Sequence, residues 1–259
     1  MSFSVRLFSL FLCSVVLSSS MALAAQDSPA APFNKTQTEN IQKLIEQYIQ
    51  ENPEAITNAL EKAQEVKDQA RVEQARKVLT ENYKDITHNP ASPVAGNPDG
   101  DITVVEYFDY QCGYCKAVAP GIRQLLKDDP QVRFVFKEFP VLGENSRHAA
   151  KAALAAHRQG KYQEFHTALM SEKGPVDAEK IRTVARNVGL DVPKLERDME
   201  SPDVAAEIDR NRSLAPQMTI MGTPGFIVGN QIISGALPLD DLKKVIADQR
   251  ARMKQGTGG

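Results

Sequence analysis

The spacing of apolar side chains predicts that the chain begins with helices. From Thr36 onward, one apolar face recurs at i, i+3, i+4, i+7 and i+8, formed by Ile41, Leu44, Ile45, Tyr48 and Ile49. Thr36 to Glu39 has the form of a capping box for this first helix. Asn52-Pro53 then predicts its end and the start of a second helix, with Asn52 as N-cap and Pro53 at the first helical position.

The second predicted helix runs from Pro53 to about Ile86 and carries a thin apolar stripe. The stripe consists of Ile56, Leu60, Ala63, Ala70, Val72, Ala75, Leu79 and Ile86. At 1.5 Å per residue such a helix would reach ~50 Å, longer than a compact domain is wide. It is therefore either a solvated strut or a surface that meets another chain in a coiled-coil-like seam. We favour the second interpretation, an oligomerisation arm over residues 36–88.

Beyond a Pro-, Gly- and Asn-rich segment at 89–100, which predicts a linker, the pattern changes. Residues 102–108 and 132–137 are apolar runs typical of buried strands. Between them, residues 115–126 have a helical pattern with Pro120 as a kink. A strand, a crossover helix and a second strand form a βαβ unit, which implies parallel pairing.

The rest of this second part, residues 101–254, combines helices with one hairpin. A long helical stretch covers about residues 146–214, with breaks near Gly174-Pro175 and Val192-Pro193. The hairpin is predicted from two short apolar runs and the turn between them, at residues 226–228, 229–230 and 231–234. A helix over 239–253 closes the chain. The fold class is therefore α/β, preceded by an α-helical arm.

Residues 1–25 predict a cleaved signal peptide. Arg6 precedes an apolar run over residues 7–17, and Ala22-Leu23-Ala24 supplies small residues for cleavage. The run is too short to span a bilayer, which needs ~20 apolar residues, although an uncleaved anchor is the alternative. Residues 26–35 follow as a polar tether. We therefore expect an exported protein.

Composition mainly excludes other classes of protein. The chain has 259 residues, 42% hydrophobic and 25% charged, as in an ordinary globular protein rather than a disordered one. Its 31 Lys and Arg balance 33 Asp and Glu, so the net charge of −2 offers no basis for binding nucleic acid. Of its three cysteines, Cys13 lies in the signal peptide. Export into an oxidising compartment would leave one close pair, Cys112 and Cys115.

Cys112-Gly113-Tyr114-Cys115 lies where a strand ends and a helix begins, which favours redox chemistry. The helix N-terminus would stabilise the Cys112 thiolate, which is the attacking species. Cys115, one turn further in, can resolve a mixed disulfide by attacking the Cys112 sulfur. A structural disulfide across so small a loop would contribute only ~2 kcal/mol. We expect no cofactor other than this redox-active disulfide.

A metal site is the competing interpretation of the cysteine pair. Structural zinc usually needs four protein ligands, and no second cysteine pair exists. His148, His157 and His166 recur every nine residues, a spacing that does not bring them cleanly onto one helical face. The sequence therefore predicts no zinc site.

Gly222-Thr223-Pro224 stands just before the predicted hairpin. A proline that enters a strand cannot donate to the ladder, so it belongs at an edge or a special bend. A plain turn is one interpretation. We prefer a cis Thr223–Pro224 bond that presents backbone to a substrate strand.

Together, these features resemble the thioredoxin-fold DsbA family of bacterial periplasmic proteins. The resemblance covers about residues 94–253 and rests on the strand at 104–109, the Cys112 motif, a helical insert at about 144–215, and Thr223-Pro224. Asn52-Pro53-Glu54 and its flanking helices further resemble the arm of the Com-like and ScsC-like branch. The resemblance implies a thioredoxin fold with a helical insertion and a periplasmic location. Association with the outer membrane stays open.

The same resemblance implies roles for individual residues. Cys112 would be the nucleophile and Cys115 the resolving thiol, and Glu106 matches a buried acid that moves a proton to or from Cys115. We expect Lys137 on the next strand to pair with Glu106, because an unpaired buried carboxylate is costly. The alternative for both charges is solvent exposure. The substrate-binding residues would be Gly113, Tyr114, Thr223 and Pro224.

The chain departs from the dedicated oxidases of the family, which carry Pro-His between the cysteines and Val before the cis-proline. Gly113-Tyr114 and Thr223 instead resemble disulfide isomerases such as DsbC. We therefore expect a homodimer, with a trimer as alternative, that isomerises and/or oxidises disulfides in unfolded or misoxidised exported proteins. A membrane redox partner would recycle its cysteines. A monomeric oxidase, a non-catalytic envelope chaperone and a Cu(I)-handling role are the alternatives.

Overall fold

The computed structural model describes residues 33–256, which fall into two compact units that divide at residue 60. The predicted signal peptide at 1–25, with Cys13, lies outside the described residues, as does most of the predicted tether at 26–35. Among the described residues, none of the helices combines the length and apolar character that crossing a membrane requires.

The first unit contains α1 (Lys35–Glu51) and the beginning of α2 (Glu54–His88). The N-cap of α1 is Asn34, not the predicted Thr36. Asn34 and Gln37 form a capping box in which each side chain accepts a 2.9 Å hydrogen bond from the other's backbone N–H. Asn is at least as good an N-cap as Thr, so the helix begins early enough to place Thr36 inside its first turn.

The apolar face of α1 is uncovered in the structure. No residue of this helix is buried, and Leu44, Ile45 and Tyr48 each expose more than half of their surface. α2 begins at Glu54, so Pro53 stands directly before the helix rather than at its first position. Both predicted helices of the arm therefore form, and they meet at Asn52-Pro53.

The second unit includes the C-terminal part of α2, which corrects our interpretation of this helix as an arm throughout. Val78, Leu79 and Ile86 are buried in an apolar cluster with residues of the sheet and of α8 (Pro202–Gln217). The thin stripe of α2 thus changes role along its length: its last turns belong to a core, while Val66 and Val72 stay exposed. Periodicity identifies an apolar face, but it cannot identify what covers that face.

A five-stranded sheet forms the centre of the second unit. Its strands are β1 (Val94–Gly96), β2 (Ile102–Phe108), β3 (Val132–Glu138), β4 (Gly225–Val228) and β5 (Gln231–Ser234). The order is β1-β3-β2-β4-β5, and β2 and β3 are parallel, as the βαβ pattern predicts. The other neighbours are antiparallel, including the predicted β4–β5 hairpin.

The expected linker at 89–100 contains strand β1, so it is not a plain connection. Val94 pairs with Val135, and the short strand extends one edge of the sheet. Three residues that include a glycine are too short to show a period of two, which is why the pattern did not predict this strand. The pairing is made by backbone groups, which any sequence supplies.

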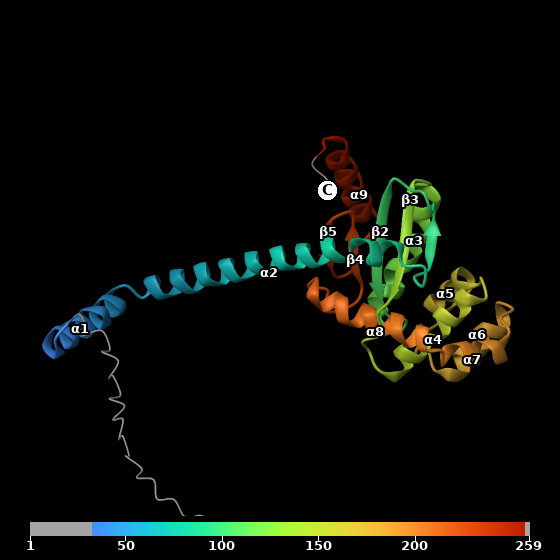
Figure 1. The fold of residues 1–259 in the computed structure, drawn as a ribbon, viewed down its shortest axis with the longest axis horizontal. Helices are drawn as coiled ribbons and strands as arrows, with labels where there is room; N and C mark the ends of the chain where they lie inside the picture. The colour runs from blue at the N-terminus through green and yellow to red at the C-terminus, as the bar shows by residue number, and fades with distance from the viewer. Residues whose placement is uncertain (1–32, 257–259) are drawn as a thin grey trace, which may run out of the picture. The chain divides into compact units, whose positions relative to one another are not determined.

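Helices cover both faces of the sheet (Figure 1). One face packs against α3 (Gly113–Asp128) and α9 (Leu239–Lys254), together with helices of the insert. The other face packs against α2 and α8. Alternation along β2 and β3 decides which side chains face which layer. Val104 and Phe108 join the first cluster, whereas Val105 and Tyr107 join the second.

The helical insert consists of separate helices rather than one broken stretch. Before α8 these are α4 (Glu144–Arg158), α5 (Tyr162–Ser171), α6 (Ala178–Asn187) and α7 (Val192–Met199). Figure 1 shows α4 to α7 gathered in one cluster. We missed the breaks at Gly160 and Gly189, whose φ angles of 69° and 72° are left-handed. Glycine adopts this conformation without steric cost, so it is common after helix ends.

Candidate functional site

The two cysteines lie at the start of α3, at the end of the sheet where β2 finishes. Cys112 is the N-cap residue of α3, and Cys115 is inside the first turn. Both thiols are free, and Cys115 is fully buried whereas Cys112 keeps 6% of its surface accessible. The outer cysteine can therefore meet another molecule while the inner one is shielded, as the sequence predicts.

The two thiols have opposite pKa shifts. Hydrogen bonding from Cys115, from the Thr223 side chain and from backbone N–H groups of Tyr114 and Cys115 lowers the pKa of Cys112 to about 5, against the opposing effect of burial. The pKa of Cys115 is raised because its thiol proton is held in the bond to Cys112, because it is buried and because Glu106 is close. At neutral pH, Cys112 is a thiolate and Cys115 a thiol.

Thr223 and Pro224 stand beside Cys112. The Thr223–Pro224 peptide bond is cis, which agrees with the interpretation that we favoured from the sequence. The Cys112 sulfur is 3.2 Å from the Thr223 carbonyl oxygen. Gly225 follows in β4, where an added Cβ would lie 2.4 Å from a side-chain carbon of Ile220, so only glycine fits. The chain thus brings together segments more than a hundred residues apart.

Glu106 is buried on the same face of the sheet as the cysteines, with 1% of its surface accessible. Burial, and secondarily the nearby Cys112, raises the pKa of Glu106 to about 8. Within residues 33–256, its Oε1 atom has no hydrogen-bond partner. This carboxyl group is therefore protonated in much of the neutral range and can exchange a proton near Cys115.

Our expectation that Lys137 pairs with Glu106 is wrong. Glu106 lies opposite Phe136, and Lys137 lies opposite Tyr107, so the two charges point to opposite faces of the sheet. Lys137 is buried as expected, but its ammonium group contacts the Ser92 hydroxyl at 2.6 Å and Glu207 at 3.4 Å. In the parallel register, Lys137 is one position further along its strand than the residue opposite Glu106. Side chains alternate between the faces of a sheet, so this one-residue offset puts the two charges on opposite faces.

Asp109 is a site residue to which we assigned no role from the sequence. It is buried directly after β2, and it accepts hydrogen bonds from three backbone N–H groups: Gln111 at 2.8 Å, Val141 at 2.9 Å and Leu142 at 3.0 Å. It thereby joins the turn that carries Cys112 to the loop after β3. The sequence did contain a signal for this residue, because an acidic residue stands between a buried strand and a CxxC motif.

A second unassigned group lies deeper, next to Tyr110. Glu138 at the end of β3 accepts hydrogen bonds from the Tyr110 and Tyr162 hydroxyls, at 3.2 and 2.9 Å. Tyr110 also lies 3.0 Å from Nδ1 of His166. Burial raises the pKa of Glu138 well above its usual range and lowers that of His166 to about 3, so burial favours the neutral form of both groups. No group of three or more His, Cys, Asp or Glu suited to a metal ion occurs in residues 33–256.

These observations define a class: a mixed sheet covered by helices, with a CxxC pair at a helix N-terminus beside a cis-proline. A family model described as the DSBA-like thioredoxin domain matches residues 103–247, more than half of the chain. The chain belongs to this family, the DsbA-like thiol–disulfide oxidoreductases. The fold is therefore the thioredoxin-like fold with a helical insert that the resemblance implies.

Solved structures support this assignment. A thioredoxin-like oxidoreductase from Silicibacter pomeroyi is 43% identical to this chain, with a TM-score of 0.64. The similarity covers 66% of this chain and 98% of the oxidoreductase. ScsC of Proteus mirabilis, in a transitional conformation, is 26% identical at a TM-score of 0.64. That similarity covers 85% of this chain and all of ScsC, and so extends beyond the residues that the family model matches.

Curated relatives give the same picture over a shorter range. Disulfide bond formation protein D of Bacillus subtilis is 26% identical to this chain over 166 residues, which cover 60% of this chain and 75% of that protein. The Na⁺/H⁺ antiporter NhaA 3 of Salinispora tropica is 28% identical over 59% of this chain. The chain spans only about a quarter (24%) of the length of that antiporter.

Proposed function

We propose that this protein exchanges disulfides in unfolded or misoxidised exported proteins through Cys112 and Cys115, isomerising and/or oxidising them. The observation that carries this proposal is the asymmetry of the pair. Cys112 reaches the surface with its pKa lowered to about 5, while Cys115 is buried with a raised pKa. A stable thiolate at an accessible position is the nucleophile that thiol–disulfide exchange needs.

In isomerisation, the Cys112 thiolate attacks one sulfur of a client disulfide, forms a mixed disulfide and releases a client thiolate. That thiolate, or another in the client, then attacks elsewhere and expels Cys112 unchanged, so no net oxidation occurs. If the client does not rearrange, Cys115 attacks Cys112 instead, and the client leaves reduced. In that step the ionised form of Glu106 accepts the Cys115 proton; Cys112 carries no charge in the mixed disulfide, so it no longer raises the pKa of Glu106.

In oxidation, the same steps run in the opposite direction. A client thiolate attacks the Cys112–Cys115 disulfide at Cys112, and Cys115 leaves as a thiolate that takes a proton from Glu106. A second client thiolate then attacks the mixed disulfide and releases Cys112. Two electrons pass from the client to the pair, so a membrane redox partner must reoxidise the cysteines before another cycle.

The substrate-binding residues are the exposed Gly113 and Tyr114 and the segment Thr223-Pro224. Tyr114 exposes 70% of its surface beside Cys112, which suits contact with an unfolded chain. The Thr223 carbonyl oxygen next to the Cys112 sulfur can accept a hydrogen bond from client backbone. Both contacts are independent of client sequence, as a general oxidoreductase requires.

We further propose that α1 and the beginning of α2 join two copies of the chain. The support is the exposed apolar face of Leu44, Ile45 and Tyr48 on a helix with no buried residue. Such a face is stable in water when another copy covers it. Two Cys112 sites in one assembly would hold a client at several surfaces, which favours isomerisation over simple oxidation. We place this activity in the periplasm, where disulfides persist.

The test is reactivation of a scrambled-disulfide substrate by the reduced protein. We expect activity from the full chain, none from Cys112→Ser, and a large loss when Leu44, Ile45 and Tyr48 are replaced together by Gln. Lys43→Gln, on the same helix, is the matched control and should keep activity. Light scattering on each variant reports whether a dimer, a trimer or a monomer is present.

Other outcomes would select the alternatives. If the full chain oxidises a reduced substrate quickly but never reactivates a scrambled one, the protein is a dedicated oxidase. If Cys112→Ser keeps the full effect on client folding, the protein is a non-catalytic chaperone, and the redox proposal fails.

A further inference from the structure

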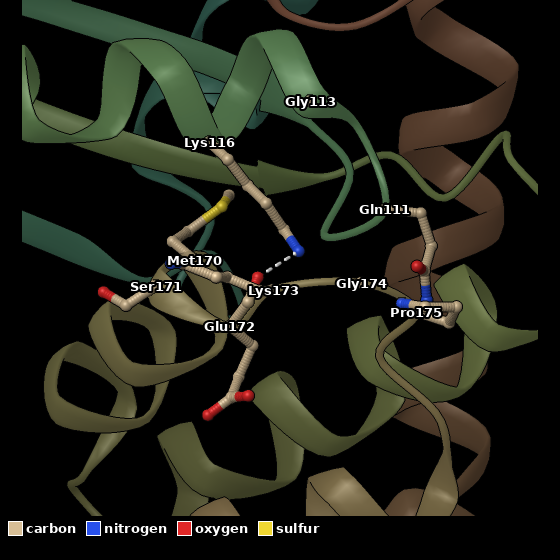
Figure 2. Close-up of a pocket in the computed structure, with 9 residues that line it drawn as sticks. All are labelled: Gln111, Gly113, Lys116, Met170, Ser171, Glu172, Lys173, Gly174 and Pro175. Carbon is tan, nitrogen blue, oxygen red and sulfur yellow. Dashed lines mark hydrogen bonds between the residues drawn. The ribbon is translucent and has the colours of Figure 1, made fainter.

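A pocket of about 580 Å³ is lined in part by residues that are neighbours of the two cysteines in the chain (Figure 2). Its lining comes from the turn before α3, from the start of α3 and from the end of α5 with the segment that follows it: Gln111, Gly113, Lys116, Met170, Ser171, Glu172, Lys173, Gly174 and Pro175. Gly113 directly follows Cys112 and Lys116 directly follows Cys115, so the pocket neighbours the cysteine pair along the chain, although neither cysteine lines it. None of the four substrate-binding residues predicted from sequence, apart from Gly113, belongs to it.

Hydrogen bonds hold the walls of this pocket in place. The Gln111 side-chain amide makes a reciprocal pair with the backbone of Val176, at 2.9 and 3.1 Å. On the other side, the Lys116 ammonium donates to the Glu172 carbonyl oxygen at 2.7 Å, as Figure 2 shows. Met170 is buried at its base. The pocket is thus formed before any client arrives, which reduces the cost of ordering on binding.

The charges at the pocket do not balance. Within residues 33–256, no carboxylate lies in ion-pair range of Lys116, and the exposed Lys173 side chain makes no hydrogen bond or ion pair. Glu172 also lines the pocket, but its carboxylate lies 3.7 Å from Lys180. Asp109 is close by, but both of its oxygens are engaged by backbone N–H groups. Within residues 33–256, the Lys116 and Lys173 ammonium groups therefore have no carboxylate in ion-pair range, although Lys116 already donates to the Glu172 carbonyl oxygen.

A client attached to Cys112 would place its neighbouring residues at this pocket. A disulfide sets the two Cα atoms about 5.5 Å apart, and an extended chain advances about 3.3 Å per residue. A residue one or two positions from the client cysteine can therefore reach past Gly113 to Lys116 and Lys173.

We propose that this pocket is a subsite for an acidic side chain of the client polypeptide, one or two residues from the client cysteine. Lys116 at the wall and Lys173 at the rim bind its carboxylate. The proposal rests on the proposed function, because the client must first exchange with Cys112. It adds a preference that the backbone contacts at Thr223 cannot provide.

The test uses short peptides with one cysteine in a mixed disulfide with a small thiol, in which Glu, Gln or Lys stands at each of the two positions on either side. The rate of exchange with the reduced full-length protein is measured for each peptide. Because a nearby charge alters the peptide sulfur itself, each rate is divided by that of the same peptide with dithiothreitol. We expect Glu to exchange about two- to fivefold faster than Gln at one of these positions, the size of a partly exposed ion pair.

Variants assign this preference to the pocket. In Lys173→Gln the ratio of Glu to Gln rates should fall to about one, and high salt should have the same effect on the unaltered protein. Lys127→Gln is the matched control, since it removes the same charge from the far end of α3, and it should keep the preference. If both variants lose the preference for Glu equally, the preference comes from the overall electrostatic field of the domain, and the proposed subsite is refuted.

The remaining outcomes separate the two proposals. Exchange with every peptide at equal normalised rates refutes the acidic subsite and leaves the proposed function standing. No exchange with any peptide, while dithiothreitol reacts with all of them, refutes the proposed function and the subsite with it.

Discussion

At the scale of residues, the pKa of Cys112 is lowered and the pKa of Glu106 is raised, for related reasons. Hydrogen bonds to the sulfur favour the Cys112 thiolate, whereas burial without a partner for Oε1 favours the neutral form of Glu106. The negative charge of Cys112 also raises the pKa of Glu106. Each group therefore helps to set the protonation of the other, and the pair titrates as a coupled system.

The Cys112 thiolate should make the stability of the reduced protein depend on pH. With a folded pKa of about 5 and an unfolded value near 8.5, the folded state binds fewer protons between these limits. The Cys112 thiolate therefore stabilises the folded state fully above the unfolded pKa, and this stabilisation is lost as the pH falls through about 5. Urea denaturation of the reduced protein against Cys112→Ser should therefore show a difference that grows from pH 5 to 8, and a constant difference would contradict the shift.

Glu138 allows a matched pair of substitutions. Glu138→Gln keeps an oxygen for the Tyr110 and Tyr162 hydroxyls and has the volume of the neutral acid, so it should cost less than about 1 kcal/mol at pH 7. Glu138→Ala removes the acceptor of the buried Tyr162 hydroxyl and one of the two partners of Tyr110, and it opens a cavity, so it should cost about 3 kcal/mol. Thermal unfolding measures both, and equal costs would mean that the carboxyl is charged in the folded protein.

At the scale of elements, β3 shows where sequence reasoning stopped. The apolar runs at 102–108 and 132–137 gave the parallel βαβ unit correctly, because strand patterning is local. Which charged residues face each other depends on the register between the strands, and no local pattern contains it. For this reason we placed Glu106 beside Lys137, although the sheet separates them. The hydrogen bonds of Glu138 to the Tyr110 and Tyr162 hydroxyls were missed because they also depend on tertiary packing.

The partner of Lys137 gives a prediction at this scale, because the contact joins β3 to α8. Lys137 and Glu207 are both nearly inaccessible, and Ser92 bonds to each of them. Lys137→Met should cost about 3–5 kcal/mol, since it leaves the buried Glu207 charge unpaired. The double variant with Glu207→Leu should recover most of that loss. Urea denaturation of the single and double variants checks this, and additive losses would disprove the coupling.

At the scale of the whole molecule, the sequence predicted the catalytic fold better than its boundary with the arm. The CxxC motif and the hairpin were indicated by short motifs with their own local physics. The cis Thr223–Pro224 bond was the interpretation we preferred over a plain turn, and the family resemblance supported it. The end of α2 was not, because Leu79 and Ile86 continue the same stripe that is exposed at Leu60. Only the tertiary fold shows that the last turns are covered.

Two truncations test this boundary. A chain that begins at residue 61 retains the second compact unit and should keep exchange activity toward small peptides. A chain that begins at residue 94 loses the buried Val78, Leu79 and Ile86, which together contribute about 5 kcal/mol or more. It should be poorly folded. Circular dichroism and thermal unfolding distinguish the two, and equal stability would show that α2 adds nothing to the core.

The opposite orientation of Glu106 and Lys137 has a consequence for protein engineering. The sheet keeps the proton chemistry of the cysteines on one side and the ion pair of Lys137 and Glu207 on the other. We therefore expect that the face with Lys137 and Glu207 can be redesigned for heat resistance, for example with an all-apolar core, without changing the reduction potential of the cysteine pair. Stability and redox strength become two properties that can be tuned separately in one small enzyme.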